Sequence, residues 1–348
     1  MRANPYITYS PAYTLVPTYE CFNRCSYCNF RKDIGNGSRL TLASARKTLT
    51  RLSSQAVSEI LILSGEVPLN SLLRQEWFVR IKEICELALS LDFLPHSNVG
   101  ILSWDEMRQL KAVNVSMGLM LEQLTPKLLS TVHKHAPSKQ PELRLQQLEW
   151  AGELKIPFTT GLLLGIGETA ADRKVTLEAI ALLQERWGHI QEVILQPHSQ
   201  GSQQSYEATS FNLFQLPEVV ATAKKILPPS ITIQIPPNLV MQPKLLLECL
   251  EAGARDLGGI SPKDEVNPDY PHPTEESLRE ILEPGGWHLV PRLPVYPQYF
   301  SWLSGSLQKK VNRSQKAAVR PRDPSGRAAQ AGFPTSGNAH QERRQKVY

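Results

Sequence analysis

The stretch Glu59-Ile60-Leu61-Ile62-Leu63, which runs directly into Ser64-Gly65-Glu66, indicates the fold class of this 348-residue chain. Four consecutive aliphatic residues are typical of a strand that is covered on both faces, as in a parallel sheet between layers of helices. The Ser-Gly pair that follows predicts a turn. We therefore expect an α/β protein in which this strand ends at an exposed loop.

Similar apolar runs recur along the chain, and amphipathic helical patterns lie between them. Eight strand–helix alternations predict a parallel sheet with right-handed crossovers, and eight is the number that closes a TIM-type (β/α)8 barrel. An open, doubly wound sheet is the alternative that the pattern leaves open. The predicted strands are Thr14–Pro17, Glu59–Leu63, Phe93–His96, Val115–Leu121, Phe158–Leu164, Glu192–Gln196, Ile231–Ile235 and Asp256–Ile260. The predicted helices are Leu42–Leu52, Gln75–Leu91, Trp104–Val113, Glu142–Leu154, Pro217–Leu227 and Leu245–Ala252, with one more in which Val175, Ala179, Ile180, Leu183 and Trp187 share a face.

The composition is that of an ordinary globular protein, with 41% hydrophobic, 20% charged and 7% aromatic residues. It excludes the fibrous, collagen-like and fully disordered classes. Because no run of about 18 apolar residues occurs, we expect no transmembrane helix and no membrane partner. Because Met1–Tyr9 lacks the apolar core of a signal peptide, we expect a cytoplasmic protein with reduced thiols.

The formal net charge of +5 is unevenly distributed. Residues 307–348 hold ten Lys or Arg and two acidic residues, whereas the rest of the chain holds 28 bases and 31 acids. The mildly acidic body does not predict a nucleic-acid surface, and spaced bases without aromatic residues are more typical of a solubilising tail. Since Ser, Gly, Pro, Gln and Arg dominate from about Ser304, we predict a barrel over residues 1–303 and a basic, disordered tail over 304–348.

Three of the five cysteines lie in one loop, where Cys21, Cys25 and Cys28 form a C-x3-C-x2-C pattern directly after the first predicted strand. An odd number of cysteines, with three inside eight residues, predicts a metal site rather than a disulfide framework. Three thiolates are too few for the four-cysteine shell of an ordinary iron–sulfur cluster. They can hold three irons of a four-iron cluster and leave the fourth open for substrate chemistry.

Other interpretations of these cysteines stay open. They can bind zinc together with a distant His96 or His198, or they can be unrelated core residues. Cys85 and Cys249 lie within apolar helical patterns, so we expect both to be buried, inert thiols.

The pattern C-x3-C-x-aromatic-C after the first strand of an α/β barrel resembles the radical S-adenosylmethionine (SAM) superfamily. The resemblance implies a 4Fe–4S cluster on Cys21, Cys25 and Cys28, whose open iron is chelated by the amino and carboxylate groups of SAM. One-electron reduction then cleaves SAM to methionine and a 5′-deoxyadenosyl radical. The cofactors carry the difficult chemistry, and the protein positions them and excludes water.

Two further elements resemble SAM-binding segments of this superfamily and follow predicted strands, where a barrel places its active site. Ser64-Gly65-Glu66 is similar to the GGE-like element; Glu66 would accept hydrogen bonds from the SAM ammonium, and Gly65 would allow close backbone approach. Gly161–Glu168 is similar to the G-x-I-x-G-x-x-E element that lies against the adenine, which implicates Gly165 and Glu168. An ordinary turn and a simple strand end are the alternatives.

Two charged residues are candidates for the same pocket. Glu122 ends the fourth predicted strand and can bind the ribose hydroxyls of SAM, and Arg144 begins the next helix and can pair with the SAM carboxylate. A solvated glutamate and a surface arginine are the alternatives.

Polar residues at the ends of the third and sixth strands are candidates for contact with a substrate. These are His96 and Asn98, then Gln196 and His198; of these, His96, Asn98 and His198 are the candidate catalytic residues. A histidine there can shuttle a proton near neutral pH. A structural hydrogen bond within the loop is the alternative for each.

A longer resemblance, from about Tyr6 to Val295, is to the first subunit of the 7,8-didemethyl-8-hydroxy-5-deazariboflavin (FO) synthase family. Pro11-Ala12 and Gln196-Pro197-His198 depart from that family's usual Arg-Asn and Gln-Asn-Phe-like segments. The matching segments are Ile7–Ser10 through Cys28–Arg31, Pro95–Gly100, Val115–Glu122, His133-Lys134, Ala136–Lys139, Ile156–Gly161, Gly253–Pro262 and Val266–Pro268.

This resemblance implies a radical SAM ammonia lyase of deazaflavin coenzyme F420 biosynthesis. Its substrate would be the adduct 5-amino-5-(4-hydroxybenzyl)-6-(D-ribitylimino)uracil, supplied by a sister radical SAM subunit, and its ring closure would release ammonia. A single cysteine triplet implies the split form of the enzyme, with the sister subunit as a separate partner. A flavodoxin- or ferredoxin-type protein would donate the electron.

Other functions compete with this one. The chain can be another radical SAM barrel enzyme, such as the sister subunit, a biotin-synthase-like enzyme or a menaquinone-pathway enzyme. It can also be a non-catalytic iron–sulfur sensor, which predicts a cluster but no SAM cleavage. The elements that end in Glu66 and Glu168 favour an enzyme, because a sensor needs no SAM pocket.

Overall fold

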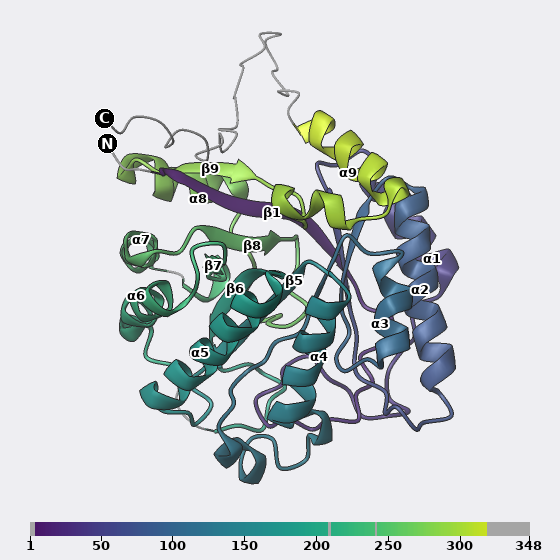
Figure 1. Ribbon diagram of the computed structural model, residues 1–348, viewed down its shortest axis with the longest axis horizontal. Helices are drawn as coiled ribbons and strands as arrows, with labels where there is room; N and C mark the ends of the chain where they lie inside the picture. The colour runs from purple at the N-terminus through teal and green to yellow at the C-terminus, as the bar shows by residue number, and fades with distance from the viewer. Residues whose placement is uncertain (1–3, 208–209, 241, 319–348) are drawn as a thin grey trace, which may run out of the picture.

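A closed barrel of parallel strands organises the chain, as described by a computed structural model for residues 4–207, 210–240 and 242–318 (Figure 1). Neighbouring strands follow the order β2-β3-β4-β5-β6-β7-β8-β1, and a pairing of β1 with β2 closes the circle. The predicted (β/α)8 barrel is thereby confirmed, and the open sheet is excluded. The strands are β1 (Tyr6–Leu15), β2 (Glu59–Leu63), β3 (Leu94–Asn98), β4 (Ser116–Gly118), β5 (Phe158–Leu164), β6 (Ile190–Pro197), β7 (Thr232–Gln234), β8 (Asp256–Ile260) and β9 (His288–Pro291).

The first strand is much longer than the predicted Thr14–Pro17, because β1 pairs with three partners in succession. Its start pairs with β9, its middle with β8 and its end with β2. Pro11 lies close to a register shift between Thr8 and Ser10, where an interrupted ladder tolerates a residue without an amide hydrogen. The additional strand β9 extends the sheet outside the barrel and was not predicted from the sequence.

Helices follow the strands and form the outer layer (Figure 1). Side-chain caps begin several of them; Ser103 and Thr169 each form a capping box. The predicted face of the fifth helix is partly wrong, since Val175 is 54% exposed while Leu177 and Ile180 are buried. The helices are α1 (Leu42–Leu52), α2 (Arg74–Ser90), α3 (Trp104–Lys111), α4 (Pro141–Glu153), α5 (Ala170–Trp187), α6 (Leu216–Ile226), α7 (Pro243–Ala252), α8 (Glu275–Leu282) and α9 (Gly305–Ala318).

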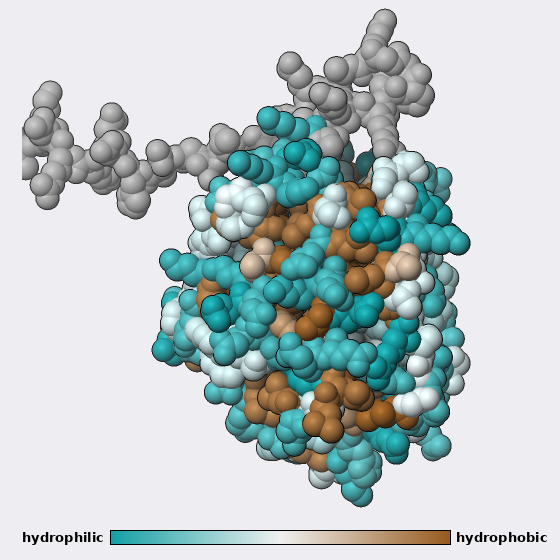
Figure 2. All heavy atoms as spheres, turned by 90° about the vertical axis from the view of Figure 1, so that its right-hand side faces the viewer, coloured by the Kyte–Doolittle hydropathy of each residue, from teal (hydrophilic) through white to brown (hydrophobic). Residues whose placement is uncertain are grey.

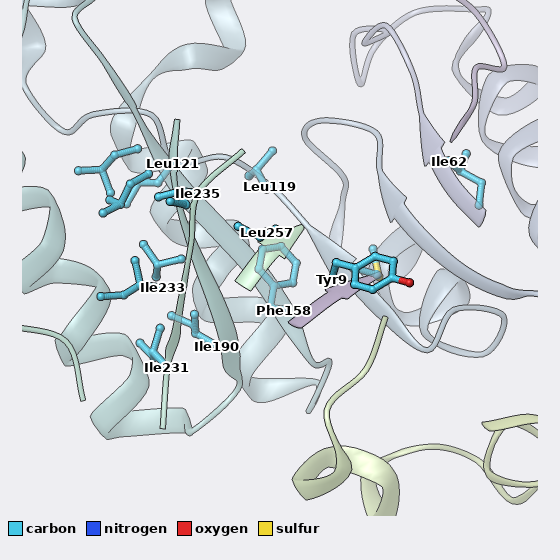
Figure 3. Packing of buried hydrophobic residues seen from close by; sticks show 14 of the residues in the cluster. Tyr9, Ile62, Leu119, Leu121, Phe158, Ile190, Ile231, Ile233, Ile235 and Leu257 are labelled. Carbon is cyan, nitrogen blue, oxygen red and sulfur yellow. The ribbon is translucent and has the colours of Figure 1, made fainter. Parts of the chain in front are cut away.

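The main core lies between the outer surface of the barrel and the helices. Ile231, Ile233 and Ile235 lie on the side of β7 that faces this layer (Figure 3), and each is at most 5% exposed. Gln234, between them in sequence, faces the inside of the barrel. The strand alternation thus separates an aliphatic outer core from a polar interior.

A second, smaller core closes the end of the barrel at which the strands begin. Leu94 contributes from the start of β3, Val115 from the position directly before β4, and Leu307 and Val311 from α9. The prediction of a disordered tail from Ser304 is therefore wrong for residues 305–318, because two buried aliphatic residues one helical turn apart give α9 an apolar face. The remainder of the predicted tail, residues 319–348, lies outside the described residues.

The surface shows no extended apolar face on the side that carries α1 and α2. There, brown apolar side chains gather in small groups between polar ones (Figure 2). No helix within the described ranges is long and apolar enough to cross a membrane.

Candidate active site at the carboxyl ends of the strands

The loop with the three cysteines follows β1 and is held by neighbouring loops. The amide of Phe22 donates to the carbonyl of Glu66 after β2 (3.1 Å), and the amide of Ser26 donates to Val132 after β4 (3.0 Å). The buried side chain of Asn29 donates to Asp269 (2.8 Å) and accepts from the amide of Gln203 (2.7 Å). The loop is therefore positioned by contacts with segments far away in sequence.

The three cysteines of this loop are free thiols at the mouth of the barrel. The sulfur of Cys21 accepts a hydrogen bond from the backbone amide of Glu66 (3.3 Å). Burial raises the pKa of Cys21 to about 12 and that of Cys25 to about 11. The thiolates of Cys21 and Cys25 therefore need a positive partner, such as a metal ion, to form at neutral pH.

The other two cysteines are buried, as predicted. Cys85 lies beside Ser97 and Asn114, and Cys249 lies in α7. Burial raises the pKa of Cys85 to about 11. Both are structural, unreactive thiols in this environment.

The histidines that a zinc site would require make other contacts. Nδ1 of His96 lies 2.7 Å from the hydroxyl of Ser116, and Nε2 of His198 lies 3.1 Å from Gln204. In the described part of the chain, no group of three or more His, Cys, Asp or Glu residues is placed to share a single metal ion such as zinc. Neither histidine completes a zinc site with the cysteines.

Ser64-Gly65-Glu66 lies against the cysteine loop. A side chain at Gly65 would come within 2.2 Å of the carbonyl oxygen of Glu20, so the predicted close approach is between two segments of this chain. The hydroxyl of Ser64 accepts from the indole of Trp77 (3.0 Å), which anchors the turn to α2. Ser64 and Gly65 thus shape the turn, and Glu66 carries its charged group.

A buried charge network lies behind the cysteines and contains both predicted charged residues, Glu122 and Arg144. Arg144, only 2% exposed, approaches Glu66 (Nη2 to Oε1, 3.4 Å) and donates to the carbonyl of Met120. Lys139 forms an ion pair of 2.5 Å with Glu122. The network holds two acids and two bases, and the alternatives of a solvated glutamate and a surface arginine are both wrong.

The electrostatics of this network favour the charged forms of Glu122 and Lys139. Burial opposes the charge on Glu122, but Lys139 and Arg144 outweigh it, so the pKa of Glu122 lies below its usual value. Burial and Arg144 oppose the charge on Lys139, yet Glu122, Cys25 and Glu66 keep its pKa above the usual value. The site therefore keeps charged groups away from bulk water, where their interactions are strong.

A short hydrogen-bonded chain couples this network to the cysteine loop. Asn23 donates to the hydroxyl of Ser138 (2.8 Å), and that hydroxyl donates to Oε2 of Glu66 (2.5 Å). The amide of Ser138 returns a bond to the side-chain oxygen of Asn23 (3.1 Å). The carboxylate of Glu66 is therefore oriented by the same loop that carries the cysteines.

The Gly-rich segment after β5 forms a turn that only glycine adopts readily at Gly165. Gly165 has a φ of +89°, a left-handed conformation that favours glycine, and a side chain there would meet Phe211. The carboxylate of Glu168 accepts from the amides of Gly165 (2.8 Å) and Ile166 (2.9 Å) and pairs with Arg173. Glu168 therefore caps this turn and holds the backbone of Gly165 in place.

A cavity of about 170 Å³ runs inside the barrel and is lined by residues from all eight of its strands. Among the predicted residues, His96, Asn98 and Gln196 line it. His198 does not: it packs edge-on against Tyr206 beyond the end of β6. The structure thus brings two of the three candidate catalytic residues to the cavity.

Burial affects both candidate histidines in the same direction. It lowers the pKa of His96 to about 3, with Arg292 acting in the same sense, and it lowers the pKa of His198 below its usual value. Both rings are neutral near pH 7, so the expected role as a proton shuttle near neutral pH does not fit either of them.

Several polar residues of the site were not singled out from the sequence. Lys139 was noted only as part of a family segment, and Glu59, Glu192 and Arg292 were not considered as site residues. Glu59 could have been found from the sequence, because it is a charged residue in the otherwise apolar strand Glu59-Ile60-Leu61-Ile62-Leu63. An unpaired buried charge is costly, so a charge at such a position suggests a role. Lys139 gives no such signal, since it lies in a polar loop.

A second hollow, of about 140 Å³, opens beside the cysteine loop. The residues that line it include Ile34, Leu40, Leu73 and Trp77. Glu66 also lines this hollow, so the hollow and the charge network share one residue.

Comparison with known proteins identifies relatives over most of the chain. The Radical SAM superfamily matches residues 15–180. A 7,8-didemethyl-8-hydroxy-5-deazariboflavin synthase of Trichormus variabilis is 68% identical over 312 residues, which are 90% of this chain and 92% of that protein. The protein of the same name from Gloeobacter violaceus is 60% identical over 302 residues, which are 87% of this chain and 93% of that protein.

Solved structures of lower identity share the fold. The FeFe-hydrogenase maturase HydG from Carboxydothermus hydrogenoformans has a TM-score of 0.70 and 19% identity, covering 90% of this chain and 78% of its own. A methylornithine synthase has a TM-score of 0.63 and 16% identity, covering 82% of this chain and 84% of its own. These similarities show the barrel architecture alone.

Proposed function

The chain belongs to the radical SAM superfamily and, within it, to the 7,8-didemethyl-8-hydroxy-5-deazariboflavin (FO) synthases, and from this we propose the reaction that it catalyses. It converts 5-amino-5-(4-hydroxybenzyl)-6-(D-ribitylimino)uracil to FO and releases ammonia, methionine and 5′-deoxyadenosine. The observation that carries this proposal is the 68% identity to a curated protein of that name over 90% of this chain. The family implies a 4Fe–4S cluster and SAM as cofactors.

Cys21, Cys25 and Cys28 are the proposed cluster ligands. They fit the group because they are three free thiols on one loop, which is the donor set of a cluster with one open iron. The amide of Glu66 already donates to the sulfur of Cys21, as amides commonly do to cluster sulfurs. When bound, the cluster and SAM supply the one-electron chemistry that removes a hydrogen atom from the substrate.

The charge network provides the proposed SAM pocket. Glu66 accepts hydrogen bonds from the ammonium of SAM, Arg144 pairs with its carboxylate and Glu122 binds its ribose hydroxyls. The ionised state of Glu122, which Lys139 supports, favours this role because a carboxylate is a strong acceptor. The turn held by Glu168 presents the backbone of Gly165 to the adenine, and Ser64 and Gly65 support Glu66 from behind.

The substrate occupies the cavity beneath this pocket. His96 and Asn98 line the cavity, which supports substrate contact for both. Since His96 is neutral, it takes part in hydrogen bonding rather than in proton transfer. His198, outside the cavity, supports the loop after β6 through Gln204.

The reaction needs partners that act before it. A sister radical SAM subunit supplies the uracil adduct, and a flavodoxin- or ferredoxin-type protein supplies the electron. The cysteine triplet of this chain serves one cluster, which supports the split form of the enzyme.

Anaerobic reconstitution tests the proposal. The holoenzyme, supplied with SAM, a reductant and the sister subunit's product, should form FO, ammonia and 5′-deoxyadenosine in equal amounts, as measured by mass spectrometry. SAM cleavage without FO would point to another radical SAM reaction. A cluster without SAM cleavage would point to the sensor alternative.

A further inference from the structure

The inner end of the barrel cavity carries an unusual set of charges. Glu59 and Glu192 face the cavity near Arg292, and Asp256 lies behind that arginine. Arg292 is the only lysine or arginine among the described residues that line the cavity. We refer to the end of the cavity at Glu59 and His96 as the cavity floor.

The guanidinium of Arg292 already donates its hydrogen bonds to groups of the protein. Its Nε donates to Oδ2 of Asp256 (2.6 Å) and its Nη2 to Oδ1 (2.9 Å), while Nη2 also pairs with Glu192 and Nη1 donates to Leu293 (3.1 Å). A guanidinium held in this way cannot turn to a new anion without breaking a buried ion pair. The cavity floor thus has no cation available for a phosphate or carboxylate of a ligand.

Glu59 is the carboxylate of the cavity floor that remains available to accept hydrogen bonds from a ligand. It is 7% exposed and faces the cavity, and no ion pair among the described residues includes it. Burial raises its pKa above the usual value, although Arg292 and the hydroxyl of Ser10 oppose the rise. Ser10 is the one described residue whose side chain donates to this carboxyl, and a ligand with hydroxyl groups would supply further donors.

His96 presents a second acceptor at the same end. The hydroxyl of Ser116 donates its one hydrogen to the carbonyl of Pro294 (2.6 Å), so Nδ1 of His96 must be the donor in its 2.7 Å contact with Ser116. Its Nε2 then carries a lone pair and makes no hydrogen bond among the described residues. A side chain at Gly118 would come within 3.0 Å of this atom, so glycine keeps the space in front of it open.

These acceptors lie deep in the barrel. Glu59, Leu61 and Leu63 alternate into the cavity along β2, and a rise of about 3.3 Å per residue puts Glu59 roughly 13 Å along the strand from Leu63, the last residue of β2. The walls between combine apolar side chains, Leu61, Met120 and Ile194, with uncharged polar ones such as Thr14 and Gln234. An elongated ligand with a polar, donor-rich end matches this order.

We propose that the cavity floor, with Glu59 and the Nε2 of His96 as acceptors, is the subsite for the ribityl hydroxyls of the substrate and that it rejects a phosphorylated chain. The inference rests on the proposed function and specifies the orientation of its substrate: the ribityl chain points inward, and the rings lie toward the cysteine loop. Hydroxyls donate to both acceptors, whereas a phosphate would face Glu59 and Glu192 without a free cation.

Equilibrium dialysis of the reconstituted enzyme tests this subsite. Three ligands are compared: FO, an analogue in which methyl replaces the ribityl chain, and the FO 5′-phosphate. The parent should bind FO at least about tenfold more tightly than either of the others, because one hydrogen bond to a charged group changes affinity by about tenfold or more. Glu59→Gln and His96→Phe should each weaken FO binding and change binding of the methyl analogue less than about twofold.

The matched control is Glu248→Gln, the same chemical change at an exposed pair on α7, which should leave all three affinities unchanged. Iron content and SAM binding report whether each variant is folded, and the ligand comparison on the parent needs no variant. Equal affinity of the parent for FO and the methyl analogue, tighter binding of the phosphate, or no binding of FO would overturn the proposal. An enzyme that forms FO without any dependence on the hydroxyls would refute the subsite alone; one that binds FO through its hydroxyls but fails to form it would refute the proposed reaction alone.

Discussion

The helix α9 offers a direct test of how the inner end of the barrel is held closed. Leu307 is 2% exposed and packs in one cluster with Leu94, Val115 and Val295. Replacing a fully buried leucine by alanine costs about 2–5 kcal/mol, because the lost contacts leave a cavity. Since a domain of this kind is stable by only about 5–15 kcal/mol, Leu307→Ala should remove a substantial fraction of the stability.

Leu307→Ala should also alter the active-site cavity, because one short segment contacts both the cavity and the cluster that contains Leu307. Along residues 292–295, Arg292 and Pro294 line the cavity, whereas Leu293 and Val295 belong to the cluster that contains Leu307. Loss of packing on one side of this segment loosens the residues on its other side. We therefore expect Leu307→Ala to raise KM for the uracil adduct while SAM binding at the opposite end of the barrel is retained.

Scanning calorimetry at matched iron content measures the stability effect, with Lys309→Ala as the control because Lys309 is exposed on the same helix. Chains that stop after residue 303 and after residue 318 extend the comparison. The shorter chain should melt several degrees lower, whereas the longer one keeps all of α9. The assignment of α9 to the folded barrel is wrong if Leu307→Ala has the same melting temperature as Lys309→Ala. It is also wrong if the shorter chain has the same melting temperature as the full chain.

Three further predictions concern the cysteine loop, the charge network and a buried histidine. Cys25→Ala should lose cluster iron and SAM cleavage together, while Cys85→Ala keeps both. Iron analysis measures the cluster content, and full iron content in Cys25→Ala would contradict the ligand assignment. Lys139→Met should raise the pKa of the buried Glu122 and weaken SAM binding about tenfold or more in equilibrium titrations, with iron content retained; unchanged SAM affinity would separate Glu122 from the SAM pocket. Burial lowers the pKa of His189 to about 4, so its contribution to stability is present above pH 6.5 and is lost as pH falls from 6.5 toward 4. Between pH 6.5 and pH 4, the melting temperature of His189→Phe should fall less than that of the parent protein. Equal falls in melting temperature for the two proteins would refute this.

Local signals in the sequence determined the barrel and the cysteine loop. Strands such as Glu59–Leu63 and Phe158–Leu164 match β2 and β5 residue for residue, because a run of aliphatic residues between turns has few other stable environments. The spacing of Cys21, Cys25 and Cys28 is equally local, and it placed the candidate cluster loop after the first strand. The first strand itself was predicted too short, since its early part is stabilised by β8 and β9, which come late in the chain.

Tertiary structure alone decided the partners of charged residues and the role of the last described helix. Arg292 meets Asp256 through the pairing of distant strands, and Lys139 meets Glu122 through the folding of the long segment between β4 and α4; no periodic pattern connects either pair. The Nε2 lone pair of His96 depends on Ser116 and on Pro294, a residue 178 positions beyond Ser116. α9 looks like a polar tail in sequence because two buried residues, Leu307 and Val311, suffice once β3 and β4 supply the rest of the cluster. Sequence patterns report the environment that a segment needs, whereas the identity of distant partners is set by which strand ends and loops the closed barrel brings together.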